Sequence, residues 1–167
     1  MASDMQRGQA SGASNADRVF RHSFSVPESA IDQNGHVNNV AYVQWMQDVA
    51  IRHFEASGCA DAPQVMGGTW VARSHRIDYL RPAFLGDSIE ARTWVAALRR
   101  VRSTRRYEFV RLDDGAVLAR GETDWVFVGA ETGRPMTIPD VIRDAFLTHA
   151  DAQNWEGAED YAEASGA

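Results

Sequence analysis

The alternation of apolar and polar residues predicts a strand and a long helix in the first third of the chain. Residues 18–26 alternate with a period of two, which is typical of a half-buried strand. From residue 39 to residue 57 apolar side chains recur at spacings of three and four, and Ser57-Gly58 ends this pattern. This segment is therefore expected to form the one long amphipathic helix of the chain, followed by a loop over residues 59–68.

Four strand-like runs follow without another long helix, and turn residues separate them. They cover residues 69–80, 88–98, 102–112 and 116–128. Asp113-Asp114-Gly115 is a typical hairpin sequence, and residues 139–147 resemble a short helix with Pro139 near its start. Four consecutive strands joined by hairpins form a meander, so we expect an α+β domain in which a curved antiparallel sheet of about five strands wraps one long central helix. The edge that such a sheet leaves open favours a dimer.

Length and composition indicate one domain, flanked by two segments of different character. The chain has 167 residues, of which 44% are hydrophobic and 24% are charged, as in ordinary globular proteins. Residues 1–17 show no periodicity and are expected to be disordered, whereas residues 18–150 form the domain. Residues 151–167 contain acidic but no basic residues, so we expect an acidic flexible tail.

The same composition excludes several classes of function. No apolar run is long enough to span a membrane, and residues 1–17 do not resemble a secretory signal. Together with a single cysteine, Cys59, this favours a cytoplasmic protein. The net charge of −6 argues against nucleic-acid binding, and the absence of lysine excludes a Schiff base. The five histidines show no metal-ligand spacing, so no metal is expected.

The most chemically capable stretch lies directly before the predicted helix. Asp32, Asn34 and His36 alternate in a glycine-containing loop, and Asn38 and Asn39 follow as candidate N-caps. A carboxylate there could remove a proton from water, and the unpaired amides of a helix start suit a developing oxyanion. The alternative for Asp32 and Asn34 is an ordinary turn role, and for His36 it is packing.

These residues also carry a resemblance to a known family. The pattern Asp-x-Asn-x-His-Val-Asn-Asn-x-x-Tyr-x-x-Trp at residues 32–45 resembles the hotdog-fold thioesterases, which include 4-hydroxybenzoyl-CoA thioesterase and the acyl-CoA and acyl-ACP thioesterases. Further similar landmarks are Ile77-Asp78-Tyr79-Leu80-Arg81-Pro82-Ala83, the strand start at residues 102–104 and Gly133-Arg134-Pro135. The resemblance covers about residues 18–147 and implies a hotdog fold.

The resemblance also implies roles for individual residues. Asp32 matches the family's general base or nucleophile, and Asn34 and His36 match its other proposed catalytic positions. Substrate contacts are implied at the helix start, at a wall of the acyl pocket and near the pantetheine and nucleotide; the residues are Asn38, Asn39, Tyr42, Arg102, Ser103 and Thr104. Core packing is the alternative for Tyr42. For the arginine run of residues 99–106 the alternative is a solvated strand face.

The expected function is hydrolysis of acyl-CoA, or of acyl-ACP, to a free acid and a thiol by a homodimer or homotetramer. Coenzyme A would take part only as a portion of the substrate, and no cofactor is implied. Two alternatives remain. A hotdog enoyl-CoA hydratase would carry Asp-x-Asn-Pro-x-His, whereas the spacing here is one residue shorter and lacks the proline. The other alternative is a protein that binds acyl thioesters without catalysis.

Overall fold

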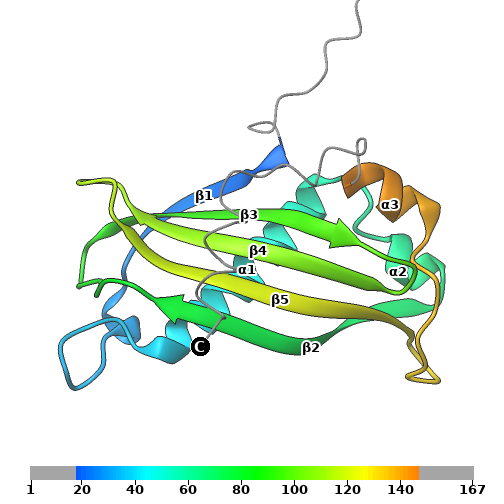
Figure 1. Cartoon of the computed structure of the whole chain (residues 1–167), viewed down its shortest axis with the longest axis horizontal. Coiled ribbons are helices and arrows are strands. Elements are labelled where there is room, and N and C mark those ends of the chain that lie inside the picture. Colours follow the sequence, from blue (N-terminus) through cyan, green and yellow to red (C-terminus); the bar gives the residue numbers. More distant parts are fainter. Residues whose placement is uncertain (1–17, 147–167) are drawn as a thin grey trace, which may run out of the picture.

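The computed structural model of the chain describes residues 18–146. The predicted disordered segment 1–17 and the predicted acidic tail 151–167 lie outside the described residues. Two layers make up the described part: a curved antiparallel sheet and a long helix, α1 (Asn39–Ala56), packed along it (Figure 1). The sheet strands are β1 (Phe20–Ser25), β2 (Gly68–Tyr79), β3 (Ser88–Leu98), β4 (Arg102–Arg111) and β5 (Val117–Gly129).

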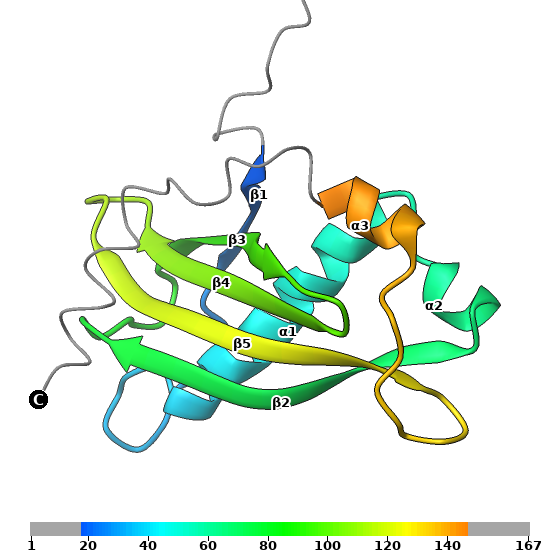
Figure 2. The ribbon, with the colours of Figure 1, turned by 45° about the vertical axis from the view of Figure 1, so that its right-hand side comes forward.

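Three short helices complete the described chain. A 3₁₀ helix, η2 (Glu28–Ala30), precedes α1, α2 (Ala62–Val65) follows it, and α3 (Asp140–Phe146) follows the sheet. The α2 helix lies in the segment predicted as a loop, where Pro63 in its first turn supplies a backbone angle that suits a helix start. Both α2 and α3 lie at the end of the sheet where α1 ends (Figure 2).

The strand order corrects the predicted meander. The order is β1-β3-β4-β5-β2, so only β3, β4 and β5 are joined as consecutive neighbours. β2 pairs with β5 from Gly68 to Tyr79 and lies at the far edge of the sheet. The N–H groups of Leu80 and Arg81 both donate to the Leu118 carbonyl, at 2.9 and 3.1 Å. The chain therefore stays beside β5 as it leaves β2, and it crosses the end of the sheet before β3 begins.

The long helix follows its predicted bounds closely because its first turn is capped by its own sequence. The Asn38 side chain accepts a hydrogen bond from the Val40 N–H at 2.8 Å. At the other end, Gly58 takes a left-handed backbone angle, φ 78°, which only glycine adopts readily. The buried face of α1 follows the helical period and consists of Tyr42, Met46, Val49 and Ala50.

The close approach of α1 to the sheet depends on a glycine in β5. A Cβ atom at Gly121 would lie 2.7 Å from the Met46 Sδ and 2.9 Å from its Cε. Gly121→Ala is therefore expected to lower the free energy of unfolding by about 1–3 kcal/mol, measured by urea denaturation. In a Met46→Ala background the same change should cost less, because the clashing atoms are gone. An equal cost in both backgrounds would contradict this packing account.

Candidate functional site

The loop before α1 is a compact turn held by its own backbone. Ile31 and Val37 form an isolated antiparallel bridge across its base. The Asp32 N–H donates to the His36 carbonyl at 2.9 Å, and the Gly35 N–H donates to the Asp32 carbonyl at 3.0 Å. Gly35 has a φ of 76°, which closes the turn without the strain that a side chain would add. The turn therefore presents Asp32, Asn34 and His36 on one short, ordered segment.

The Asp32 carboxylate is half-buried, and only one of its two oxygens is hydrogen-bonded within the described residues. One oxygen, Oδ1, accepts a hydrogen bond from the Asn34 N–H at 2.8 Å. Within residues 18–146 no partner is found for the other oxygen. One oxygen thus fixes the carboxylate in place, while the second remains able to accept a proton from a bound water.

The side chains of Asn34 and His36 are both exposed. The His36 ring packs edge-on against Phe84, with ring centroids 5.3 Å apart. Among the described residues no hydrogen bond joins either side chain to the Asp32 carboxylate. The structure therefore brings all three residues into one turn, and the link to Asp32 is made by the Asn34 backbone.

The start of α1 offers a free backbone donor beside this turn. The Asn38 N–H donates to the Ala30 carbonyl at 2.7 Å, and the Asn39 carbonyl accepts from the Tyr79 hydroxyl at 2.9 Å. These bonds tie the helix start to the turn and to β2. In the described part of the chain the Asn39 N–H has no hydrogen-bond partner, as expected for the first amide of a helix. This amide, at the positive end of the helix dipole, is suited to bind an oxyanion.

Tyr42, the predicted wall residue, lies in the core. Its side chain is 3% exposed and its ring contacts the rings of Trp45, Tyr79 and Phe109. Burial raises the pKa of Tyr42 to about 12, and the neighbouring Tyr79 acts in the same direction. Tyr42 therefore stays protonated at neutral pH. Its contact with a substrate stays a prediction.

The three residues predicted at the start of β4 do not share a face. Arg102 forms an ion pair with Asp124 at 3.1 Å, and Thr104 points to the same side of the strand. Ser103 points to the other side, where it is buried beneath α1. Alternation along β4 thus separates Arg102 and Thr104, on the outer face of the sheet, from Ser103, on the helix side.

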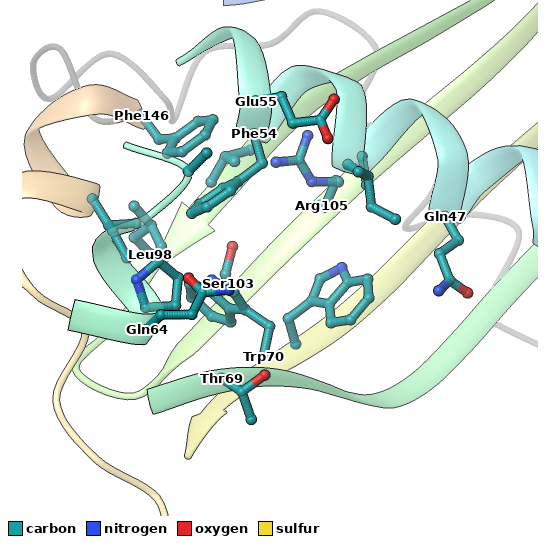
Figure 3. A pocket seen from close by; sticks show the side chains of 17 residues that line it. Gln47, Phe54, Glu55, Gln64, Thr69, Trp70, Leu98, Ser103, Arg105 and Phe146 are labelled. Atoms are coloured by element: carbon teal, nitrogen blue, oxygen red, sulfur yellow. The ribbon is translucent and has the colours of Figure 1, made fainter. Parts of the chain in front are cut away.

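A cavity of about 380 Å³ lies at the opposite end of α1, between this helix, the sheet, α2 and α3 (Figure 3). Its walls are mostly apolar and include Phe54, Trp70, Leu98 and Phe146. The main polar exception is Arg105, which is only 6% exposed. It belongs to the arginine run of residues 99–106, for which the sequence predicts contacts near the pantetheine and nucleotide or, as the alternative, a solvated strand face. The sequence signal that could have placed it inside is strand alternation, since Arg105 shares a face with the buried Phe109.

Arg105 is held by neutral acceptors. Its Nη1 donates to the His53 Nδ1 at 2.8 Å and to the Thr93 Oγ1 at 3.2 Å. Burial, together with the charge of Arg105, lowers the pKa of His53 to about 3. His53 is therefore neutral at pH 7, so its Nδ1 can accept the hydrogen bond that Arg105 donates.

The lowered pKa of His53 predicts a definite pH dependence of stability. Between pH 6.5 and about 3 the histidine is protonated in the unfolded chain but not in the folded one, so stability is lost as the pH falls through this window. His53→Gln should reduce proton uptake on unfolding at pH 5 by about one proton, measured from urea unfolding across this range. An unchanged pH dependence would contradict the assignment of a neutral, buried His53.

Within residues 18–146 no group of three His, Cys, Asp or Glu side chains is placed to hold a metal ion. In the same part of the chain no helix is both long and apolar enough to cross a membrane.

Comparison with solved structures shows the class of fold. A 1,4-dihydroxy-2-naphthoyl-CoA thioesterase from Synechocystis superimposes with a TM-score of 0.71 at 18% identity, over 79% of this chain and 99% of that one. A Staphylococcus aureus hypothetical protein, solved in complex with CoA, gives a TM-score of 0.72 at 18% identity, over 83% of this chain and 93% of that one. The fold is the predicted hotdog fold, with its five-stranded curved sheet and long helix.

Sequence comparison then defines the family. A profile of the thioesterase-like superfamily matches residues 26–146, and the chain belongs to this superfamily. A palmitoyl-acyl carrier protein thioesterase from Cuphea hookeriana is 25% identical over 138 residues, which are 78% of this chain and 33% of that protein. The chain thus spans about a third of the length of this relative.

Proposed function

We propose that the chain hydrolyses acyl thioesters at the turn that precedes α1. The observation that carries this proposal is the Asp32 carboxylate, which has one oxygen fixed by the Asn34 N–H and one without a partner in the described structure. Thioester cleavage also needs a hydrogen-bond donor for the oxyanion. The Asn39 N–H at the start of α1, which has no partner in the described residues, is the donor in this proposal. Membership of the thioesterase-like superfamily supports the same reaction.

In the proposed reaction Asp32 acts as the general base. Its free oxygen takes a proton from water as the water oxygen bonds to the thioester carbonyl carbon. The negative charge that develops on the carbonyl oxygen is stabilised by the Asn39 N–H and the dipole of α1. The carbon–sulfur bond then breaks, and the thiolate leaves and is protonated. Direct attack of Asp32 on the carbonyl carbon is the alternative first step.

The remaining residues of the turn have supporting roles in this proposal. In this proposal the exposed Asn34 amide holds the attacking water, and the exposed His36 imidazole binds the thioester oxygen or the leaving group. Asn38 shapes the site by capping α1. Arg102 and Thr104, on the outer face of β4, are proposed to contact the phosphate-bearing portion of the carrier, whereas Ser103 faces the cavity.

Acyl-CoA and acyl-ACP are both proposed carriers, because similar proteins are named for each. The reaction as written requires no metal and no redox cofactor, and CoA enters only as part of the substrate. A cytoplasmic location is proposed on the composition of the chain alone.

The exposed edge of β2 supports a homodimer or homotetramer. Among the described strands β2 pairs only with β5, and its residues 71–76 are exposed on both faces. Unpaired backbone groups along so long an edge are a template for pairing with another strand. We propose that β2 of a second copy pairs with this edge. Light scattering of the purified chain should then give at least twice the monomer mass.

The reaction class is tested by supplying the same acyl groups on CoA and on ACP, and the corresponding enoyl group on CoA. Hydrolysis releases a free thiol, whereas hydration consumes the enoyl double bond and leaves the thioester intact. Thiol release from at least one carrier supports the proposal. Hydration without thiol release would instead identify a hydratase, and binding without either change would identify a carrier-binding protein.

A further inference from the structure

The cavity beneath the second half of α1 is separate from the turn that contains Asp32. Ile51, on its wall, is twelve residues beyond Asn39, which corresponds to about 18 Å along a helix. Residues of α2 and α3 line the cavity, and Figure 2 shows these two helices near the end of α1 that is opposite the Asp32 turn. Its volume of about 380 Å³ and mostly apolar lining are in the range of small-molecule sites.

No carboxylate of the described structure forms an ion pair with Arg105 within 4.0 Å. Glu55, an exposed residue of α1, also lines the cavity (Figure 3), and it too forms no such pair with Arg105. The hydrogen bonds of Arg105 to His53 and Thr93 both use Nη1. Within residues 18–146, Nε and Nη2 make no hydrogen bond, so three N–H groups of the guanidinium remain available.

Burial of the Arg105 guanidinium without an ion-pair partner costs free energy, and a bound anion would reduce this cost. Arg105 is 6% exposed, and burying an unpaired charge is unfavourable. The other arginines that β4 contributes at residues 102, 106 and 111 each form an ion pair with Asp or Glu. The Phe146 ring packs over the Arg105 guanidinium, with 5.7 Å between the ring centroid and the Arg105 Cζ. This contact does not supply a negative charge.

We infer that this cavity binds an apolar molecule that ends in a carboxylate. The carboxylate would accept hydrogen bonds from Nε and Nη2 of Arg105, the pair of donors that matches its two oxygens. The apolar body would lie among Phe54, Leu98 and Trp70. Two sources supply this chemistry: a free carboxylic acid, or the distal carboxylate of an acyl group whose thioester lies at the active site.

Calorimetric titration with octanoate and with 1-octanol tests the carboxylate site. The two probes share an apolar chain and differ in charge. Octanoate should bind the full chain, and Arg105→Met should weaken its binding by about 10- to 100-fold, since charged hydrogen bonds are lost. Octanol should bind wild type and variant equally. Arg105→Lys keeps the charge without the fork of donors, and it should retain part of the affinity for octanoate.

Two measurements separate this role from a structural one. Arg120→Met removes an arginine from the outer face of β5, where it pairs with Glu108, and it should leave octanoate binding unchanged. The ligand-free Arg105→Met variant should unfold at a urea concentration close to that of wild type, because removal of a buried charge without an ion-pair partner offsets the loss of its hydrogen bonds to His53 and Thr93. Failure of octanoate to bind wild type, or equal binding by Arg105→Met, would overturn the inference.

A second experiment distinguishes a free carboxylic acid from the distal carboxylate of an acyl group. Only this experiment rests on the proposed thioester hydrolysis. If the carboxylate belongs to the acyl group, its chain must span the roughly 18 Å between the two regions. In that case kcat/KM should be higher for hexadecanedioyl-CoA than for palmitoyl-CoA, and Arg105→Met should abolish this preference. If it belongs to a free acid, octanoate should alter hydrolysis of octanoyl-CoA in wild type but not in the variant. Binding of octanoate without any hydrolysis would uphold the cavity site and reject only the proposed function.

Discussion

Replacing Asp32 with asparagine is expected to lower kcat for thioester hydrolysis by about 10²–10⁴-fold, the usual contribution of a general base. Asparagine retains an oxygen that can accept the Asn34 N–H, which Asp32 Oδ1 binds at 2.8 Å, so the turn should keep its shape. It cannot take a proton from water. KM should therefore change little while kcat falls, as measured by colorimetric thiol release from the preferred acyl thioester.

The matched control is Asp113→Asn, which removes the same charge from the exposed hairpin between β4 and β5. This variant should keep wild-type kcat. Circular dichroism and thermal unfolding should show that both variants fold. Full activity in Asp32→Asn would mean that another group activates water, and the proposed mechanism would be wrong.

Truncating Phe109 to alanine should cost about 3–5 kcal/mol of unfolding free energy, the usual range for a buried phenylalanine. Phe109 is 0% exposed, and its ring contacts the rings of Tyr42 and Trp45 in α1. Its removal leaves a cavity between the sheet and the first two turns of α1. Urea unfolding, monitored by far-ultraviolet circular dichroism, measures the loss.

Leu112→Ala is the control for this change, because Leu112 follows β4 directly and is 47% exposed. Its cost should stay within about 0.5 kcal/mol, as for most surface substitutions. Similar losses for the two variants would show that the ring contacts between Phe109 and α1 do not contribute as described.

The helix and the strands were predictable from the sequence because local signals determine them. The bounds of α1 follow from an asparagine cap, a period of three to four and a stop at Gly58. The bounds of β3 were predicted without error, since turn residues flank a clear alternation. The order of the strands was not predictable in this way. Pairing of β2 with β5 depends on contacts some fifty residues apart in the chain, and no short-range pattern encodes them.

In the candidate site, too, the features set by local sequence were predictable and those set by long-range contacts were not. The turn at residues 32–36 and the cap at Asn38 are local, and the sequence located both. The cavity is assembled from α1, α2, α3 and the four strands β2, β3, β4 and β5, so no single stretch of sequence predicts it. Neither sequence reading of the arginine run, carrier contacts or a solvated strand face, predicted a buried Arg105, because arginine is seldom buried without a carboxylate partner. The proposed carboxylate site in the cavity rests on this departure from the usual rule.

If water cleaves an acyl thioester at this site, an oxygen atom of that water must appear in the acid that is released. Wild-type protein is incubated in ¹⁸O-labelled water with the acyl-CoA and acyl-ACP panel, and free thiol and free acid are quantified together. We expect equal amounts of thiol and acid, with one oxygen of the acid taken from the labelled water. Absence of thiol release from every acyl thioester, or release of thiol without free acid, would contradict the account.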